Sequence, residues 1–285
     1  MFLLIALVFG LSVAHIVLLP IEKALVANAK TTGKSDPKMV VGEAVKLSRP
    51  VIQWALGIRS FEESAAAMNP LQSPAPPDPW TTFLLDKRPA LLSVIFLILM
   101  LGMPLLISLL AFNQIAGDVQ TRGIRYVLLR TERANIFIGR FVGTAFFSTL
   151  VMAIIIATIT FYLGANVRIY PTGLLIRWAL HGFCALAVLM LLYIALCSLI
   201  SASVDSPFLS LALGVLLIGG VLLFPLIARL AWEPAINLKY ALPWGFRNQL
   251  LHPDLSHSLG AGLGCLGYML VFLVLGYYRF ETRDL

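Results

Sequence analysis

Charged residues are scarce in this sequence. Only 12% of its 285 residues are Asp, Glu, Lys or Arg, about half of the roughly 25% that is usual in soluble domains. Hydrophobic residues make up 59%. This balance excludes an ordinary soluble domain and indicates an integral membrane protein. The net charge is +7, but no aromatic residues are interleaved with a basic patch, so we predict no nucleic-acid partner. Basic residues between apolar runs instead set topology or contact anionic lipid.

Cysteine is also rare, and its spacing fits neither a metal site nor a disulfide framework. All three cysteines fall inside apolar runs, where we expect small buried hydrophobic side chains: Cys184, Cys197 and Cys265.

Histidine and catalytic motifs offer little more. His181 lies inside an apolar run, where we expect a packed ring. His252 and His257 are five residues apart with Asp254 between them, but Pro253 interrupts any helix, so we predict no metal site. The chain has no G-x-S-x-G and no HExxH sequence, so we expect it not to be an enzyme by itself.

Six apolar runs are long enough, or nearly so, to cross a bilayer as helices. None contains an internal Asp, Glu, Lys or Arg, so the chain lacks the buried charges of an ion-coupled transporter. We predict an all-α polytopic membrane protein, one permease-like domain over residues 1–285. The first run lacks a basic n-region and is expected to be a retained span. The spans are predicted at 2–19, 90–112, 141–163, 178–200, 207–228 and 258–278.

The connection at 21–89 is polar and rich in proline near its end. Its stretch "NAKTTGKS" resembles a phosphate-binding P-loop, but Asn28 replaces the first glycine. Pro37 follows soon after, where the motif needs the start of a helix. We therefore predict a polar linker and no nucleotide binding in this chain.

The connection at 114–140 is short, basic and half-amphipathic, with five arginines between 117 and 140. From Ile124 its pattern predicts a short amphipathic helix at the interface, then a turn at 131–135. Composition alone leaves an anchor for anionic lipid as an open alternative. Counting Lys and Arg on the two sides does not settle the orientation, because including the 21–89 loop reverses the balance.

The order of residues in this segment is more specific: Asp118, Gly123, Leu128, Leu129, Arg133, Ile138 and Arg140. It resembles the membrane subunits of ABC transporters of the type-2 exporter class (ABC-2 permeases), which read approximately E-x(4)-G-T-x(3)-L-L, then R, then K. Asp118 stands for the usual Glu, Ile124 for Thr, and Arg140 for Lys.

The resemblance implies a role for each region. Residues 114–140 would be a cytoplasmic coupling segment that docks on an ATP-binding subunit, and the long 21–89 loop would be extracytoplasmic, open to an external partner. Residues 229–257 would form an external re-entrant segment with a break at Pro243 and Trp244. The coupling residues would be Gly123, Leu128, Leu129 and Arg133, with Asp118 and Arg140 orienting the segment.

The resemblance also implies the function. The chain would be the permease subunit of an ATP-driven exporter in a bacterial cell membrane, paired with a second copy or a sister permease and surrounded by lipid. ATP and Mg²⁺ would be bound by the partner subunit, and this chain would hold no cofactor. Two alternatives remain: a membrane-anchored scaffold or sensor that uses the 21–89 loop, and a lipid-modifying membrane enzyme. The sequence does not identify the transported substrate.

Overall fold

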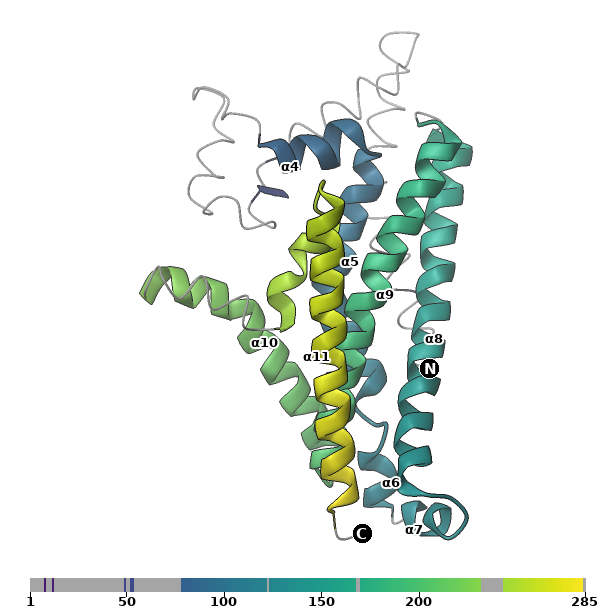
Figure 1. Cartoon of the computed structure of the whole chain (residues 1–285). Helices are drawn as coiled ribbons and strands as arrows, with labels where there is room; N and C mark the ends of the chain where they lie inside the picture. The colour runs from purple at the N-terminus through teal and green to yellow at the C-terminus, as the bar shows by residue number, and fades with distance from the viewer. Residues whose placement is uncertain are drawn as a thin grey trace. The chain divides into compact units, whose positions relative to one another are not determined.

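A computed structural model of the chain describes residues 78–121, 123–167, 170–231 and 243–283, and five earlier positions, 8, 12, 49, 52 and 53 (Figure 1). Within these residues every regular element is helical, as predicted. The "NAKTTGKS" stretch lies outside the described residues, as do most of the first predicted span and most of the 21–89 loop.

Four helical stretches are long and apolar enough to cross a membrane, which is the pattern of a membrane-embedded protein. They contain α5 (Ala90–Ala111), α8 (Arg133–Tyr162), α9 (Thr172–Ser203) and α11 (Leu255–Glu281), and they match four of the six predicted spans. A further helix, α10 (Pro207–Ala231), covers the predicted fifth span. Among the described residues its apolar stretch is Pro207–Leu217, which is shorter than a span. Six spans therefore stay a prediction.

The surfaces of α8 and α11 carry many apolar side chains. On α11 they include Leu259, Leu263, Leu270 and Val274, each more than half exposed. Soluble monomers seldom expose apolar patches of this extent. Lipid, or another apolar surface, is therefore the expected neighbour of these two helices.

The chain divides into two compact units, and the helices α5, α8 and α9 each contribute one part to each unit. One unit is formed by Leu7–Leu101 and Ala153–Cys184, and within it Trp178 of α9 contacts several described side chains. The Trp178 indole Nε1 donates to Ser93 Oγ at 3.0 Å, and His181 stacks on the ring at 5.2 Å. The guanidinium of Arg88 lies 5.0 Å from the centre of the Trp178 ring, a cation–π distance. The packed ring predicted for His181 is confirmed.

Two short elements precede α5 in this unit. The helix α4 (Pro79–Thr82) begins at Asp78, whose carboxylate accepts hydrogen bonds from the first amides of the helix. A π-helical turn, η1 (Phe83–Lys87), follows and leads into α5.

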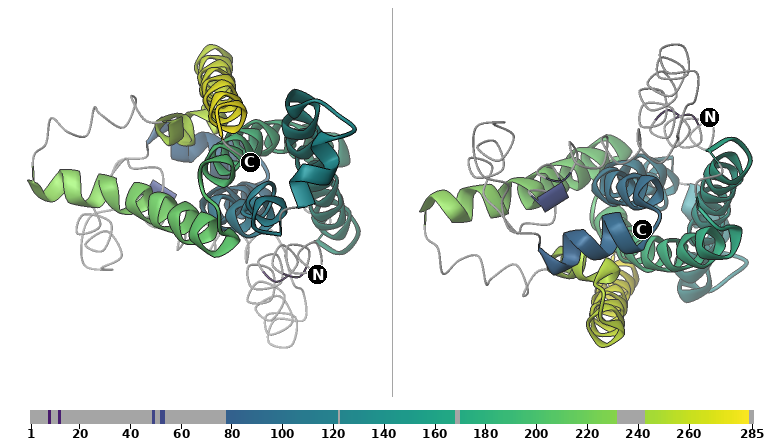
Figure 2. Two further views of the ribbon diagram at one scale, coloured as in Figure 1. Left: turned by 90° about the horizontal axis from the view of Figure 1, so that it is seen from below. Right: turned by 90° about the horizontal axis from the view of Figure 1, so that it is seen from above.

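The other unit comprises Gly102–Met152 and Ala185–Leu285, together with the first six residues. It holds two short helices, α6 (Ala116–Gln120) and α7 (Gly123–Leu128), and the 3-10 turns η4 (Pro243–Phe246) and η5 (Asn248–Leu251). In Figure 1, α6 and α7 lie at the same end of this unit as the last turns of α11. The helix α10 diverges from α11 along its length (Figure 2).

Close helix packing in this unit depends on Gly276 of α11. A Cβ added there would lie 2.9 Å from Phe137 Cζ and 3.2 Å from the backbone Cα of Leu199, so only glycine fits without displacement. Gly260, Gly262 and Gly267, by contrast, would meet no described atom within 4 Å. Cys197 and Cys265 are buried as predicted, whereas Cys184 on α9 is exposed.

Candidate functional site: the segment between α5 and α8

The predicted coupling segment is a compact helical connection. The helix α5 ends at Ala111, α6 and α7 follow, and α8 begins at Arg133. The backbone amides of Arg130 and Thr131 donate to the carbonyl of Val127 at 3.0 and 3.1 Å, which closes the turn after α7. The predicted short helix and turn are present, but α8 begins within the predicted turn, so the long helix includes the last eight residues of the region assigned to the connection.

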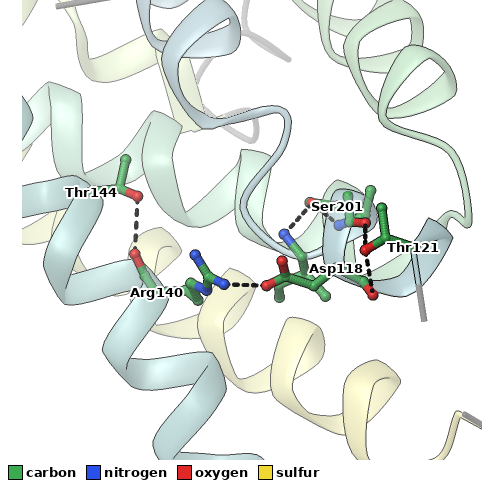
Figure 3. A network of polar contacts seen from close by, with 8 residues as sticks. Asp118, Thr121, Arg140, Thr144 and Ser201 are labelled. Carbon is green, nitrogen blue, oxygen red and sulfur yellow. Dashed lines mark hydrogen bonds and ion pairs between the residues drawn. The ribbon is translucent and has the colours of Figure 1, made fainter. Parts of the chain in front are cut away.

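Ser201 of α9 anchors the start of the segment (Figure 3). Its Oγ accepts hydrogen bonds from the backbone amides of Ile115 and Ala116, each at 3.0 Å. These amides begin α6, which has no capping side chain of its own at Ile115. Ser201 is fully buried, so a side chain 85 residues away in sequence performs the work of a local N-cap.

Asp118 and Arg140 form an ion pair between α6 and α8 (Figure 3). Both side chains are partly exposed, 36% for Asp118 and 49% for Arg140, so solvent weakens the pair and its net stabilisation is modest. Sequence reasoning placed both residues in an orienting role, and the structure brings them into contact.

An apolar cluster lies beneath the segment and connects it to three long helices. Its buried members come from the α6 region, α7, α8, α9 and α11: Ile115, Ile124, Phe137, Ala202 and Phe280. Leu128 packs against this cluster. A displacement of α7 would therefore press directly on side chains of α8, α9 and α11, because close-packed interiors transmit strain.

The tip of the segment, formed by Tyr126, Val127 and Leu129, faces away from this cluster. Leu129 is 84% exposed and Tyr126 is 77% exposed, and Val127 beside them is exposed as well. The pair Leu128 and Leu129, predicted together as coupling residues, is thus divided between a supporting inner position and an exposed outer one.

Arg133, predicted as a coupling residue, makes its described contacts within the chain. It is half-buried, and its guanidinium is directed to the end of α11. Its Nη1 donates to the carbonyl oxygens of Glu281 at 2.6 Å and Arg283 at 2.9 Å, with a longer contact to Phe280 at 3.4 Å. These carbonyls have no partner within the helix, and a cation there also complements the helix dipole.

Arg283 extends this connection to α9. It donates to the carbonyls of Ala202 at 2.9 Å and Val204 at 3.2 Å, and it forms an ion pair with Asp205. Partial burial lowers the pKa of the Arg283 guanidinium from its ordinary value. An arginine side chain nevertheless stays charged at neutral pH. The end of α11 is thereby tied to both α8 and α9. Sequence reasoning missed Arg283, because its partners lie about eighty residues away.

Gly123 begins α7 without a steric requirement for glycine. A Cβ there would lie 3.4 Å from Thr121 Oγ1 and 3.9 Å from the Asp118 carbonyl, which are ordinary contact distances. A hollow of about 240 Å³ lies next to the segment. Its lining includes Asp118, Arg140, Val127 and Asn135.

The re-entrant segment is only partly described. Pro243 and Trp244 open the 3-10 turn η4, while the half-helix predicted before them falls in 232–242, outside the described residues. After η5, the structure brings His252, Asp254 and His257 together. The argument from helical spacing that dismissed this group does not apply, because His252 lies before α11 and the turn returns it to the helix.

The comparisons with known proteins add no family to this geometry. No protein-family model and no curated protein matches the chain, so a functional conclusion rests on the residues and contacts described above.

Proposed function

We propose that this chain is the membrane subunit of an ATP-driven transporter, and that α7 with the following turn is the surface that docks a separate ATP-binding subunit. The supporting observation is the two-sided character of this segment. Its outer side presents Leu129 and Tyr126 to solvent, while its inner side packs on a cluster shared with α8, α9 and α11.

Such an arrangement suits mechanical coupling. A partner that grips the tip and moves would push α7 against Phe137 and Phe280, which lie on α8 and α11. The connections through Ser201, Arg133 and Arg283 make the segment and the helix ends move together. Rigid-body tilting of helices by a moving partner is an established type of conformational switching. The export direction and the pairing with a second permease copy belong to the same proposal and follow from the resemblance of 118–140.

Leu129→Asp is the test. The chain is purified from its native host, and co-purifying proteins are labelled with a photoreactive ATP analogue. We expect an ATP-labelled subunit with the wild-type chain, and binding at least about tenfold weaker for the variant, because a buried leucine contributes roughly 1.5–3 kcal/mol.

Leu255→Asp is the matched control. Leu255 is 66% exposed and lies at the opposite end of α11, about 40 Å from the tip region by helix length. We expect it to retain the labelled subunit. The proposal is wrong if no ATP-labelled protein accompanies the wild type, or if both variants retain it equally. Arg133→Glu is a poorer test, because it would also break the contacts that Arg133 makes with α11.

A further inference from the structure

The start of α11 gathers two imidazoles and a carboxylate at one point. One ligand atom from each of His252, Asp254 and His257 lies within 4.8 Å of the others. The Nδ1 atoms of both histidines are 3.8 Å from Asp254 Oδ2, and the two rings are 4.7 Å apart at their centres.

The local backbone explains this convergence. The turn η5 ends at Leu251, and His252 adopts an extended conformation before Pro253. Asp254 is the N-cap of α11. His257 follows Asp254 by three residues, so it stands above it on the same helical face. Ser258 Oγ donates to the Leu250 carbonyl at 2.7 Å, which holds η5 against this first turn.

Two details distinguish this group from a chance collection of surface side chains. An aspartate at an N-cap normally accepts from the free amides of the first turn, yet Asp254 makes no such bond to the described residues and its carboxylate faces the histidines. In addition, the Asp254 amide donates to His252 Nδ1 at 3.1 Å. A lone pair of that nitrogen accepts this bond, and a lone pair on an imidazole nitrogen is what a Zn²⁺ ion binds.

We propose that His252, Asp254 and His257 form a Zn²⁺-binding site. Two imidazole nitrogens and one carboxylate oxygen are ligands that Zn²⁺ takes, with water as the fourth ligand in an open tetrahedral site. Ligand atoms in such a site are about 3.4 Å apart, so the widest possible pair here has to close by about 1.4 Å. His257 is 61% exposed and Asp254 is 66% exposed, so rotations of their side chains achieve this without moving α11. Coordination through His252 Nδ1 would replace the hydrogen bond that this nitrogen accepts from the Asp254 backbone amide.

The bound ion would fasten the turn after η5 to the first turn of α11, in addition to the hydrogen bond from Ser258. This inference does not depend on the proposed transport function, because every ligand lies far along α11 from the coupling segment.

Equilibrium dialysis of the untagged full chain in lipid nanodiscs, with Zn²⁺ and with Mg²⁺, tests the site. We expect one Zn²⁺ per chain with micromolar or tighter affinity, and no retention of Mg²⁺, which prefers oxygen ligands. His252→Ala and His257→Ala should each weaken Zn²⁺ binding by about 100-fold or more, since loss of a supporting hydrogen bond alone costs 10–100-fold. The tetrahedral ligand field should appear in the visible absorption spectrum with Co²⁺ in place of Zn²⁺.

The control is His181→Ala, which removes a histidine that stacks on Trp178 in the other unit and should leave Zn²⁺ affinity unchanged. If His252→Ala does not yield folded protein, Asp254→Asn and the exposed His257→Ala decide the question. The proposal is overturned if the wild-type chain retains no more Zn²⁺ than empty nanodiscs do. It is also overturned if His257→Ala and Asp254→Asn bind Zn²⁺ as tightly as the wild type.

Discussion

Ser201→Ala should release the start of the coupling segment from α9. The substitution removes one hydroxyl oxygen that accepts from both Ile115 N–H and Ala116 N–H at 3.0 Å. Both Ser201 and the two donor residues are buried, so water does not replace the lost acceptor.

The expected loss follows from these two orphaned amides. An unsatisfied buried donor costs about 1–3 kcal/mol, and loss of a helix N-cap costs about 0.5–2 kcal/mol. Because one acceptor serves both amides, we expect Ser201→Ala to lower the free energy of unfolding by about 2–4 kcal/mol. The loss should be concentrated in α6, whose amides should exchange with deuterium faster than in wild type.

Ser203→Ala is the matched control for this experiment. Ser203 is exposed, also lies on α9, and its hydroxyl donates only to the Leu199 carbonyl of its own helix. We expect its stability to stay within about 0.5 kcal/mol of wild type. The account of the anchor is refuted if hydrogen exchange over 114–121 is the same in Ser201→Ala, Ser203→Ala and wild type.

Two further substitutions test the packing and the ion pair. Gly276→Ala should destabilise the protein by about 1–3 kcal/mol in reversible unfolding, because its Cβ would press on Phe137 and on the α9 backbone. The control Gly267→Ala has open space around it and should be neutral, or stabilising by up to about 1 kcal/mol through helix propensity. Equal effects of the two substitutions would contradict the close approach of α11 to α8 and α9. Arg140→Asp should lower the free energy of unfolding by no more than about 1 kcal/mol, as expected for an exposed ion pair. Adding Asp118→Arg should restore the hydrogen exchange of α6 to the wild-type rate. If α6 exchanges as fast in the double variant as in the single one, the pair does not orient the segment.

Sequence reasoning predicted the elements that depend on local pattern. The all-helical class, four of the six predicted apolar spans and the short helix that begins at Gly123 follow from hydrophobic runs and turn residues that lie close together in the chain. The resemblance also singled out Asp118 and Arg140 as the residues that orient the segment, and the structure brings the two side chains into contact.

The remaining features depend on contacts that a linear pattern does not encode. Leu128 and Leu129 are adjacent and alike, yet α7 ends between them, so that Leu128 packs on the apolar cluster while Leu129 begins the turn and is exposed. In the sequence Arg133 looks like the other arginines of the segment. Its partner at the end of α11 lies nearly 150 residues later in the chain, so only the structure distinguishes it. The group at His252 and His257 was dismissed because helical spacing was assumed where an extended turn precedes the helix.

Crosslinking from the tip of the coupling segment tests the central proposal most directly. A photoreactive amino acid replaces Leu129 in the full chain in native membranes, and another replaces Leu255 as the control; adducts are identified by mass spectrometry. The account predicts a protein adduct at position 129 that binds ATP, and none of that adduct at position 255. Adducts at position 129 with lipid alone would show that the exposed tip lies on the membrane surface, and would contradict the account.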